Sequence, residues 1–174
     1  MASNILQFTI YELFLSTVFG LLSIYFSQLL ICKTIIKCQF AELFKKENMA
    51  LAVFGGTLIV CFLILTRASI LPSVTFLQYK ASGPAGLDFA FYIQAFLYFL
   101  LFFFVSFFSA MVLLFLSSKI VTVSTKEVDE IAEIKKGNLA TALLISFVMI
   151  SFTLYTKPSL EHFLSGVVHT LTAR

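Results

Sequence analysis

The chain has 174 residues, of which 60% are hydrophobic, 16% are aromatic and only 12% are charged. Soluble domains contain about 25% charged residues, and one core of this size could not bury so many apolar side chains, 22 Phe among them. The net charge of +3 is small and the basic residues lie beside apolar runs, so the sequence lacks the broad basic face of nucleic-acid-binding proteins. The composition predicts a protein that is solvated by lipid.

Four apolar runs are long enough to cross a membrane, for which a helix needs about 20 residues. The first run is 10–32 and contains a single charge, Glu12. Its length, and the lack of a Lys or Arg before it, argue against a cleaved signal peptide. The other runs, 49–66, 89–118 and 139–156, contain no charged residue. The sequence therefore predicts an all-α, polytopic membrane protein with four transmembrane helices.

Two segments between the spans have features of their own. Residues 67–88 contain Pro72 and a Ser-Gly-Pro-Ala-Gly run, which predict an irregular loop that ends where Asp88 caps the third span. Residues 125–136 begin with acidic side chains and end with two lysines, a charge order that complements the helix dipole. They predict a short cytoplasmic helix that Gly137 terminates.

The C-terminal segment follows a proline. Pro158 suits the first position of a helix, because its missing N–H group would be unpaired there in any case. Apolar residues then recur at helical spacing, for example Leu160, Leu164 and Val168. This pattern predicts a separate amphipathic helix over 158–174 that lies in the outer membrane interface.

The distribution of Lys and Arg predicts the orientation of the chain, because cytoplasmic loops carry an excess of these residues. The loops after the first and third spans contain eight of them: Lys33, Lys37, Lys45, Lys46, Lys119, Lys126, Lys135 and Lys136. The opposite side has four: Arg67, Lys80, Lys157 and Arg174. We expect both loops in the cytoplasm and both termini outside.

The two halves of the chain share a motif. Residues 45–52 and 135–142 both follow the pattern K-K-x-N-[LM]-A-x-A, and each copy lies where a span begins. Units of two helices point the same way in the membrane, which makes the repeat parallel. We therefore expect one membrane domain over 1–174, with repeats over about 8–66 and 88–156 and an amphipathic tail over 158–174.

The residues of this motif have physical roles that the sequence predicts. Asn48 and Asn138 stand where an N-cap belongs, which matters more in lipid because water cannot satisfy the first N–H groups. The lysines are expected at headgroup level, where they reach lipid phosphates: Lys45, Lys46, Lys135 and Lys136. Small residues after each Asn predict helix-packing faces: Ala50, Ala52, Gly55 and Gly56 in one unit, Ala140, Ala142 and Ser146 in the other. An alternative places the two Asn side chains in a ligand or ion path.

Polar side chains form a stripe on the first span that the third span partly repeats. Its members are Glu12, Ser16, Gly20, Ser23 and Ser27, then Ser106, Ser109 and Ser117. The sequence shows no catalytic triad, metal cluster or phosphate-binding glycine loop, so we expect no enzyme, cofactor or metal. The hypothesis that fits best is a non-enzymatic structural or partner-binding subunit, in contact with membrane lipids, that oligomerises through small-residue faces. The alternative is a channel or transporter component with a serine-lined path.

Several of these motifs together resemble one protein family. They are the N-x-A-x-A element at Asn48 and Asn138, the two-unit layout, residues 86–90 (GLDFA) followed by Gln94, and the helix that ends in residues 135–138 (KKGN). They resemble the bacterial integral-membrane family catalogued as domain of unknown function 350, over about residues 8–156, the tail being less typical. This chain differs in its few glycines in the fourth span and its many Phe in the third. The resemblance implies a bacterial inner-membrane protein and no reaction, since the family has no assigned catalytic residues.

Overall fold

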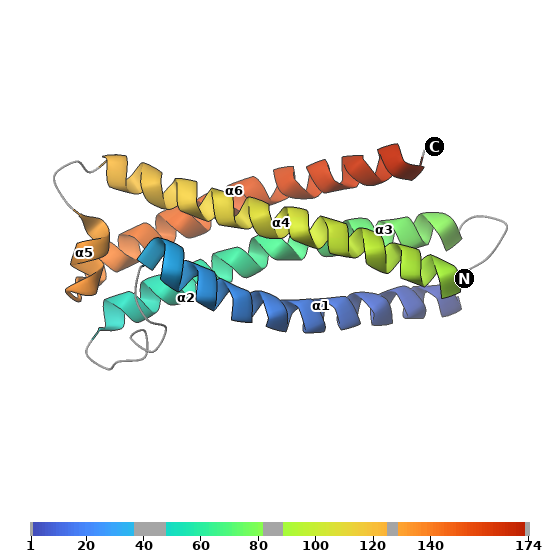
Figure 1. Cartoon of the computed structure of the whole chain (residues 1–174), viewed down its shortest axis with the longest axis horizontal. Helices are drawn as coiled ribbons and strands as arrows, with labels where there is room; N and C mark the ends of the chain where they lie inside the picture. The colour runs from blue at the N-terminus through green and yellow to red at the C-terminus, as the bar shows by residue number, and fades with distance from the viewer. Residues whose placement is uncertain (1, 37–47, 82–88, 125–128, 173–174) are drawn as a thin grey trace.

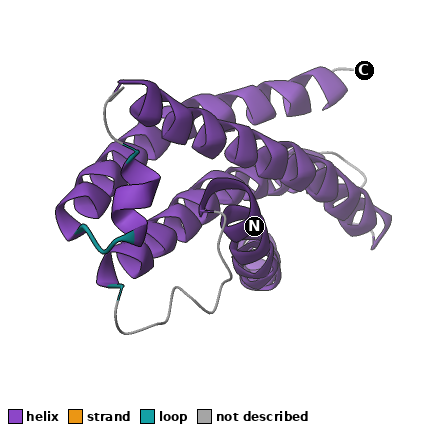
Figure 2. Cartoon of the chain, turned by 60° about the vertical axis from the view of Figure 1, so that its left-hand side comes forward, coloured by secondary structure: helices purple, strands orange, loops and turns teal. Residues whose placement is uncertain are grey.

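The computed structural model describes residues 2–36, 48–81, 89–124 and 129–172 of the chain. Within these ranges every regular element is a helix (Figure 2). The elements in chain order are α1 (Ala2–Ile31), the π-helix η1 (Cys32–Ile36), α2 (Met49–Thr66), the 3₁₀ helix η3 (Arg67–Ser69), α3 (Ile70–Ala81), α4 (Phe89–Ser124), α5 (Glu130–Lys135) and α6 (Leu139–Thr172).

Four long helical spans form the body of the protein, and both chain termini lie at one end of it (Figure 1). We call this the terminal end, and the opposite end, where α5 lies, the α5 end. The spans contain 27 to 32 residues and are apolar enough to cross a membrane: Ile5–Ile31, Met49–Tyr79, Phe89–Ile120 and Leu139–Val168. Large apolar side chains such as Leu13, Phe108 and Phe147 are exposed on their outer faces. The chain is a multi-pass membrane protein, as the sequence predicted.

The helices are longer than the sequence predicted, and the segment 67–88 shows why. Residues 67–81 were expected to be irregular, but η3 and α3 continue α2 along the bundle (Figure 1). Pro72 lacks the N–H group that would bond to the carbonyl of Ala68, so the chain tightens into a 3₁₀ turn at this point instead of ending the helix. Residues 82–88, including the expected cap Asp88, lie outside the described residues.

The separate C-terminal helix that Pro158 predicted is not observed. α6 runs from Leu139 to Thr172 without a break, and Pro158 lies inside it. The apolar stripe assigned to the membrane interface packs instead within the protein, since Leu164 and Val168 join a buried cluster with Phe76 of α3. Packing against neighbouring helices therefore holds the segment in line with the bundle despite the lost hydrogen bond.

The short helix α5 is confined to Glu130–Lys135, half the length of the segment 125–136 that the sequence indicated, and residues 125–128 lie outside the described residues. It ends in a Schellman motif, in which the N–H of Gly137 donates to the carbonyl of Ile134 and the N–H of Asn138 donates to that of Glu133, both at 3.0 Å. Gly137 adopts φ 94°, in the left-handed region. Asn138 thus ends one helix and begins the next.

The helix α2 lies at the centre of the bundle and packs against α1, α4 and α6, most extensively against α6. Phe54 and Leu58 of α2 share a buried cluster with Ala142 and Met149 of α6. The same cluster takes in Ile31 at the end of α1. The α5 end of the protein is therefore a closely packed apolar core.

The Phe residues of α4 form a ladder along the helix that explains the unusual composition of the third span. Phe19 of α1 lies edge-on against Phe99 and Phe103, with ring centroids 4.5 and 5.0 Å away. Further along, Phe107 meets Phe62 of α2 at 5.1 Å and an interplanar angle of 90°. Edge-to-face pairs of this kind are each worth about 0.5–1.5 kcal/mol beyond their burial. These ring contacts join both α1 and α2 to α4.

The positive φ of Gly137 yields a test of the α5–α6 corner. We expect Gly137→Ala to destabilise the protein by about 1–2 kcal/mol, because an L side chain is strained in the left-handed region. Gly166→Ala is the matched control: Gly166 lies within α6 with open space around its Cβ position, so this change should leave stability equal or higher by up to ~1 kcal/mol. Thermal unfolding in detergent, followed by circular dichroism, measures both. Equal melting temperatures for the two variants would contradict the assignment.

Candidate functional site

Asn48 joins the beginning of α2 to the end of α5. Its Oδ1 atom accepts a hydrogen bond from the backbone N–H of Leu51 at 2.9 Å, which is an N-cap. Its Nδ2 group donates to the carbonyl oxygen of Lys135 at 2.7 Å. That carbonyl belongs to the last turn of α5, whose final carbonyls have no intrahelical partner. One side chain therefore satisfies orphan backbone groups of two helices from different halves of the chain.

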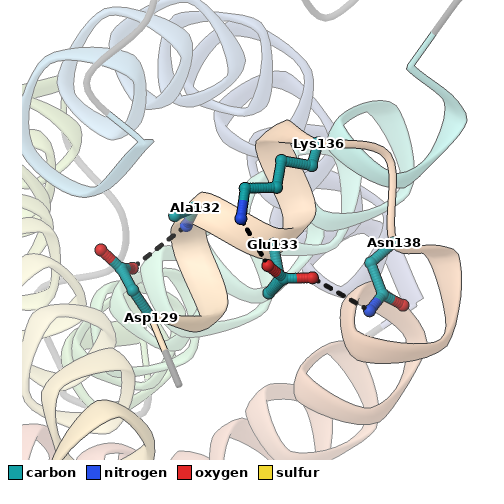
Figure 3. Close-up of polar contacts among 5 residues, drawn as sticks. All are labelled: Asp129, Ala132, Glu133, Lys136 and Asn138. Atoms are coloured by element: carbon teal, nitrogen blue, oxygen red, sulfur yellow. Dashed lines mark hydrogen bonds and ion pairs between the residues drawn. The ribbon is translucent and has the colours of Figure 1, made fainter. Parts of the chain in front are cut away.

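Asn138 lies in a second, more exposed cluster at the α5–α6 corner (Figure 3). Its Oδ1 accepts from the N–H of Thr141 at 3.2 Å, and its Nδ2 lies 3.5 Å from Glu133 Oε2. Lys136 Nζ contacts the other carboxylate oxygen of Glu133 at 2.8 Å. Asp129 caps α5 by accepting from the N–H of Ala132 at 3.1 Å.

The electrostatics of this cluster follow from these contacts. The hydrogen bonds from Lys136 and Asn138, with the charge of Lys136, hold the pKa of Glu133 below its ordinary value of 4.5. The same hydrogen bond and the charge of Glu133 raise the pKa of Lys136. Lys136 is thus engaged within the protein as well as being solvent-exposed. Lys45 and Lys46, expected beside it at headgroup level, lie outside the described residues.

The small residues of the two motifs have different surroundings. In α2, Ala50 and Gly55 are buried, whereas Ala52 and Gly56 are exposed. In α6 the pattern is reversed, since Ala140 is exposed and Ala142 and Ser146 are buried. The motif therefore supplies one small-residue pair to the α2–α6 contact and leaves another pair uncovered on α2.

A cavity of about 580 Å³ lies between α1, α4 and the α2–η3–α3 kink. We call it the α1–η3 cavity. Its polar lining comes from α1 and from the kink: Thr9, Glu12, Ser16, Ser23, Thr66, Arg67 and Ser69. Its apolar wall comprises Leu13, Phe19, Gly20, Leu63, Ile70, Phe99 and Phe103. The volume falls within the roughly 300–1,000 Å³ typical of small-molecule sites.

The local structure explains both the space and its polarity. The Pro72 turn brings Arg67 to the wall of the cavity, and Gly20 contributes no side chain on the α1 side. The hydroxyl protons of Thr66 and Ser69 are used within the helix, on the carbonyls of Phe62 at 3.0 Å and Thr66 at 2.8 Å. The oxygen atoms of these two side chains therefore remain able to accept a hydrogen bond from a ligand.

Counting residues places two of the cavity's side chains at the edge of the hydrocarbon. From the α5 end, 20 uncharged residues (13–32) separate Glu12 from Lys33, 18 (49–66) precede Arg67 and 18 (139–156) precede Lys157. At 1.5 Å per residue these runs measure about 27–30 Å, the thickness of the hydrocarbon layer. Lys157 pairs with Glu161 at 2.7 Å. Glu12 and Arg67 form no ion pair within the described residues.

The stripe of polar residues predicted from the sequence is only partly brought together. Glu12, Ser16 and Ser23 line the cavity. Ser27 is fully buried beyond it, and its hydroxyl donates to the carbonyl of Ile24 at 2.8 Å. Ser106 is also fully buried, does not line the cavity, and its hydroxyl has no partner. The stripe is therefore discontinuous within one chain.

Sequence reasoning missed the contribution of Arg67 to this site. The signal was present: Arg67 is the first charge after an uncharged span and stands five residues before a proline. Had residues 67–81 been recognised as a continuation of the helix, Arg67 would have been placed on the same helical span as Thr66, at the level of Glu12. Among the described residues, no three His, Cys, Asp or Glu side chains lie together as a bound metal ion would require.

Comparison with known proteins finds a match to one protein family, and this match assigns no activity. Residues 92–173 match the model of the family described as Domain of Unknown Function (DUF350). The match includes the tail that the sequence indicated as least typical, and it begins within α4. No curated protein and no solved structure matches the chain. The match of residues 92–173 to the DUF350 family agrees with the sequence resemblance.

The two bonds of Asn48 can be separated by substitution. We expect Asn48→Ala to lower the free energy of unfolding by about 2 kcal/mol, about half from the cap and half from the bond to Lys135. Asn48→Asp retains the cap oxygen and loses the donor, so about 1 kcal/mol should be lost. Asn138→Ala should also lose about 1 kcal/mol, because its second contact is long. Unfolding in mixed micelles measures all three, and equal losses for Asn48→Ala and Asn48→Asp would contradict the interhelical bond.

The lowered pKa of Glu133 predicts a dependence of stability on pH. A carboxyl group whose pKa is lower in the folded than in the unfolded state stabilises the protein above its unfolded pKa. That stabilisation is lost as the pH falls through the folded pKa. The melting temperature should therefore fall more steeply between about pH 5 and pH 3 for the wild type than for Glu133→Gln. Identical slopes for the two proteins would show that the Glu133 contacts contribute nothing in solution.

Proposed function

We propose that this protein belongs to the DUF350 family and is a non-enzymatic membrane subunit whose copies associate through the exposed small-residue face of α2. The observation that carries the proposal is the position of Ala52 and Gly56, four residues apart and both exposed. A Cβ atom built on Gly56 would meet no atom within 4 Å beyond its chain neighbours and the backbone of its own helix. In lipid, such faces let two helices approach closely enough for van der Waals packing to hold them together.

The second copy of the motif supports this reading. Ala142 and Ser146, at the equivalent spacing in α6, are buried, and Ala142 belongs to the cluster that α6 forms with α2. One chain therefore already uses this pattern once to pack two helices. Two copies of α2, each with an uncovered Ala52–Gly56 pair, would form a self-complementary contact of the same kind, as a two-fold dimer requires.

The proposal extends to topology and location. The parallel two-unit repeat is supported by the two Asn N-caps, which begin α2 and α6 in the same way at the α5 end. The excess of Lys in the segments at that end supports a cytoplasmic α5 end and termini on the outer side. We place the protein in the bacterial inner membrane on the strength of the family resemblance.

A channel or transporter component is the second candidate, favoured by the polar lining of the α1–η3 cavity. Within one chain the lining of the cavity on α1 ends at Ser23, and the next residues on this face, Ser27 and Ile31, do not contribute to it. Transport would therefore need a path between chains. Ion flux into liposomes that Ser16→Leu abolishes, with expression unchanged, would favour this candidate.

Dimerisation through α2 can be tested with a pair of glycine variants. We expect Gly56→Leu to weaken self-association in liposomes by about tenfold or more, since the leucine holds the two helices apart. Gly166→Leu places the same side chain at an exposed glycine of α6 and should leave association unchanged. Energy transfer between labelled chains, measured over a range of protein-to-lipid ratios, gives the dissociation constants. A monomeric wild type, or equal effects of the two variants, would refute the proposal.

A further inference from the structure

We propose that the α1–η3 cavity binds a zwitterionic phospholipid whose headgroup carries a primary ammonium, that is, a phosphatidylethanolamine. In this arrangement Arg67 binds the phosphate and Glu12 binds the ammonium. One acyl chain extends along the aromatic wall toward Ser23. The site lies in the leaflet on the side of the chain termini.

The charges of the cavity carry the first step of the argument. Three charged residues end the uncharged runs of three spans on the terminal side, while the fourth span is uncharged over 89–118. Lys157 is compensated by Glu161, whereas Glu12 and Arg67 line the cavity with opposite charges and form no ion pair within the described residues. Uncompensated charges at this depth are costly unless a counter-charge or water reaches them. A zwitterion supplies both counter-charges in a single ligand.

The depth of these residues selects a lipid over a soluble zwitterion. Glu12 and Arg67 lie about 27–30 Å from the opposite edge of the hydrocarbon, which is where the phosphates and glycerol groups of one leaflet begin. From Glu12 the cavity follows α1 inward as far as Ser23, about 16 Å by helical rise. Its charged lining therefore lies at headgroup level, with Thr9, Ser69 and Ile70 on the outer side of the two charges. The part of the cavity from Ser16 to Ser23 lies within the acyl region.

The apolar wall of the cavity fits an acyl chain. Phe19 and Phe103 lie against each other on one side, and Gly20 leaves open space on α1 where other residues would place a side chain. Ser16 interrupts this wall on the same helix as Glu12 and can contact the polar linkage between headgroup and chain. The cavity is thus polar at the membrane surface and mainly apolar inside, as a phospholipid is.

The chemistry of the two charges selects among common phospholipids. The Arg67 guanidinium can form paired hydrogen bonds to phosphate oxygens. Glu12 accepts hydrogen bonds, which a primary ammonium donates and a trimethylammonium cannot. An anionic phosphatidylglycerol would leave Glu12 without a counter-charge. We therefore expect phosphatidylethanolamine to bind more tightly than phosphatidylcholine or phosphatidylglycerol.

Native mass spectrometry of the detergent-solubilised full chain, titrated with each of the three lipids, tests the site. For the wild type we expect phosphatidylethanolamine to bind about tenfold more tightly than the other two lipids. Arg67→Gln should weaken its binding by about tenfold, and Glu12→Gln should abolish the preference for it over phosphatidylcholine. Gly20→Leu, which fills the cavity and keeps both charges, should weaken binding of all three lipids.

Two controls separate this site from general contact with lipid. Lys157→Gln removes the third boundary charge, which lies outside the cavity, and should leave the lipid preference unchanged. Gly56→Leu adds the same bulk as Gly20→Leu at a position of α2 that does not line the cavity, about 10 Å along the helix from Leu63, and should leave binding unchanged. If Arg67→Gln does not fold, Arg67→Lys keeps the charge and should show an intermediate loss. Equal binding of the three lipids by the wild type, or a loss in Lys157→Gln as large as in Arg67→Gln, would overturn the proposal.

Discussion

The hydrogen bond from Asn48 to the carbonyl of Lys135 fixes the α5 end of the protein, and the arrangement of the spans depends on it. Helix ends in or near a membrane leave backbone groups that water cannot fully satisfy. Asn48 serves the first turn of α2 and the last turn of α5 together, so the two most extensively packed helices, α2 and α6, begin side by side. The close apolar core at this end follows from that alignment.

The helix α1 is held differently, and its attachment accounts for the cavity. Near the terminal end Tyr11 shares a hydrogen bond with Ser73 at 2.9 Å, and Ser73 donates to the carbonyl of Ala95 at 3.0 Å, which links α1, α3 and α4. At the α5 end Ile31 enters the main buried cluster. Between these points α1 meets α4 through the ring of Phe19. Because α1 is held at these two places and aromatic rings keep it apart from α4 between them, space remains alongside α1 for the cavity.

The sequence correctly predicted the features that depend on the transfer of side chains from water to lipid. The errors of the prediction concern two of the three prolines. The uncharged runs predicted the four spans correctly, because a charged side chain in the hydrocarbon layer is strongly unfavourable. Pro72 and Pro158 were interpreted as boundaries, since proline removes a hydrogen bond from any isolated helix. In the bundle that loss is offset by contacts with neighbouring helices. The packing of Leu164 and Val168 accompanies a continuous α6, and a 3₁₀ turn precedes Pro72 in the first half. Local rules cannot include these contacts.

The difference between local structure and packing between distant helices also decides which parts of the candidate site could be predicted. Asn48 and Asn138 could be placed at helix N-termini from the sequence, because a cap is a local structure. The partner of Asn48 in α5 could not, and neither could the meeting of Glu12 with Arg67 in one cavity wall, since both depend on how helices far apart in sequence pack.

The two copies of the motif also differ in burial: at equivalent positions, Ala142 is buried and Ala52 is exposed. Helix α2 packs against α1, α4 and α6, whereas α6 packs against α2, α3 and α4, so similar sequences meet different surroundings. This inequality leaves an uncovered small-residue face on α2, and it is again the first half that supplies all the polar lining of the α1–η3 cavity.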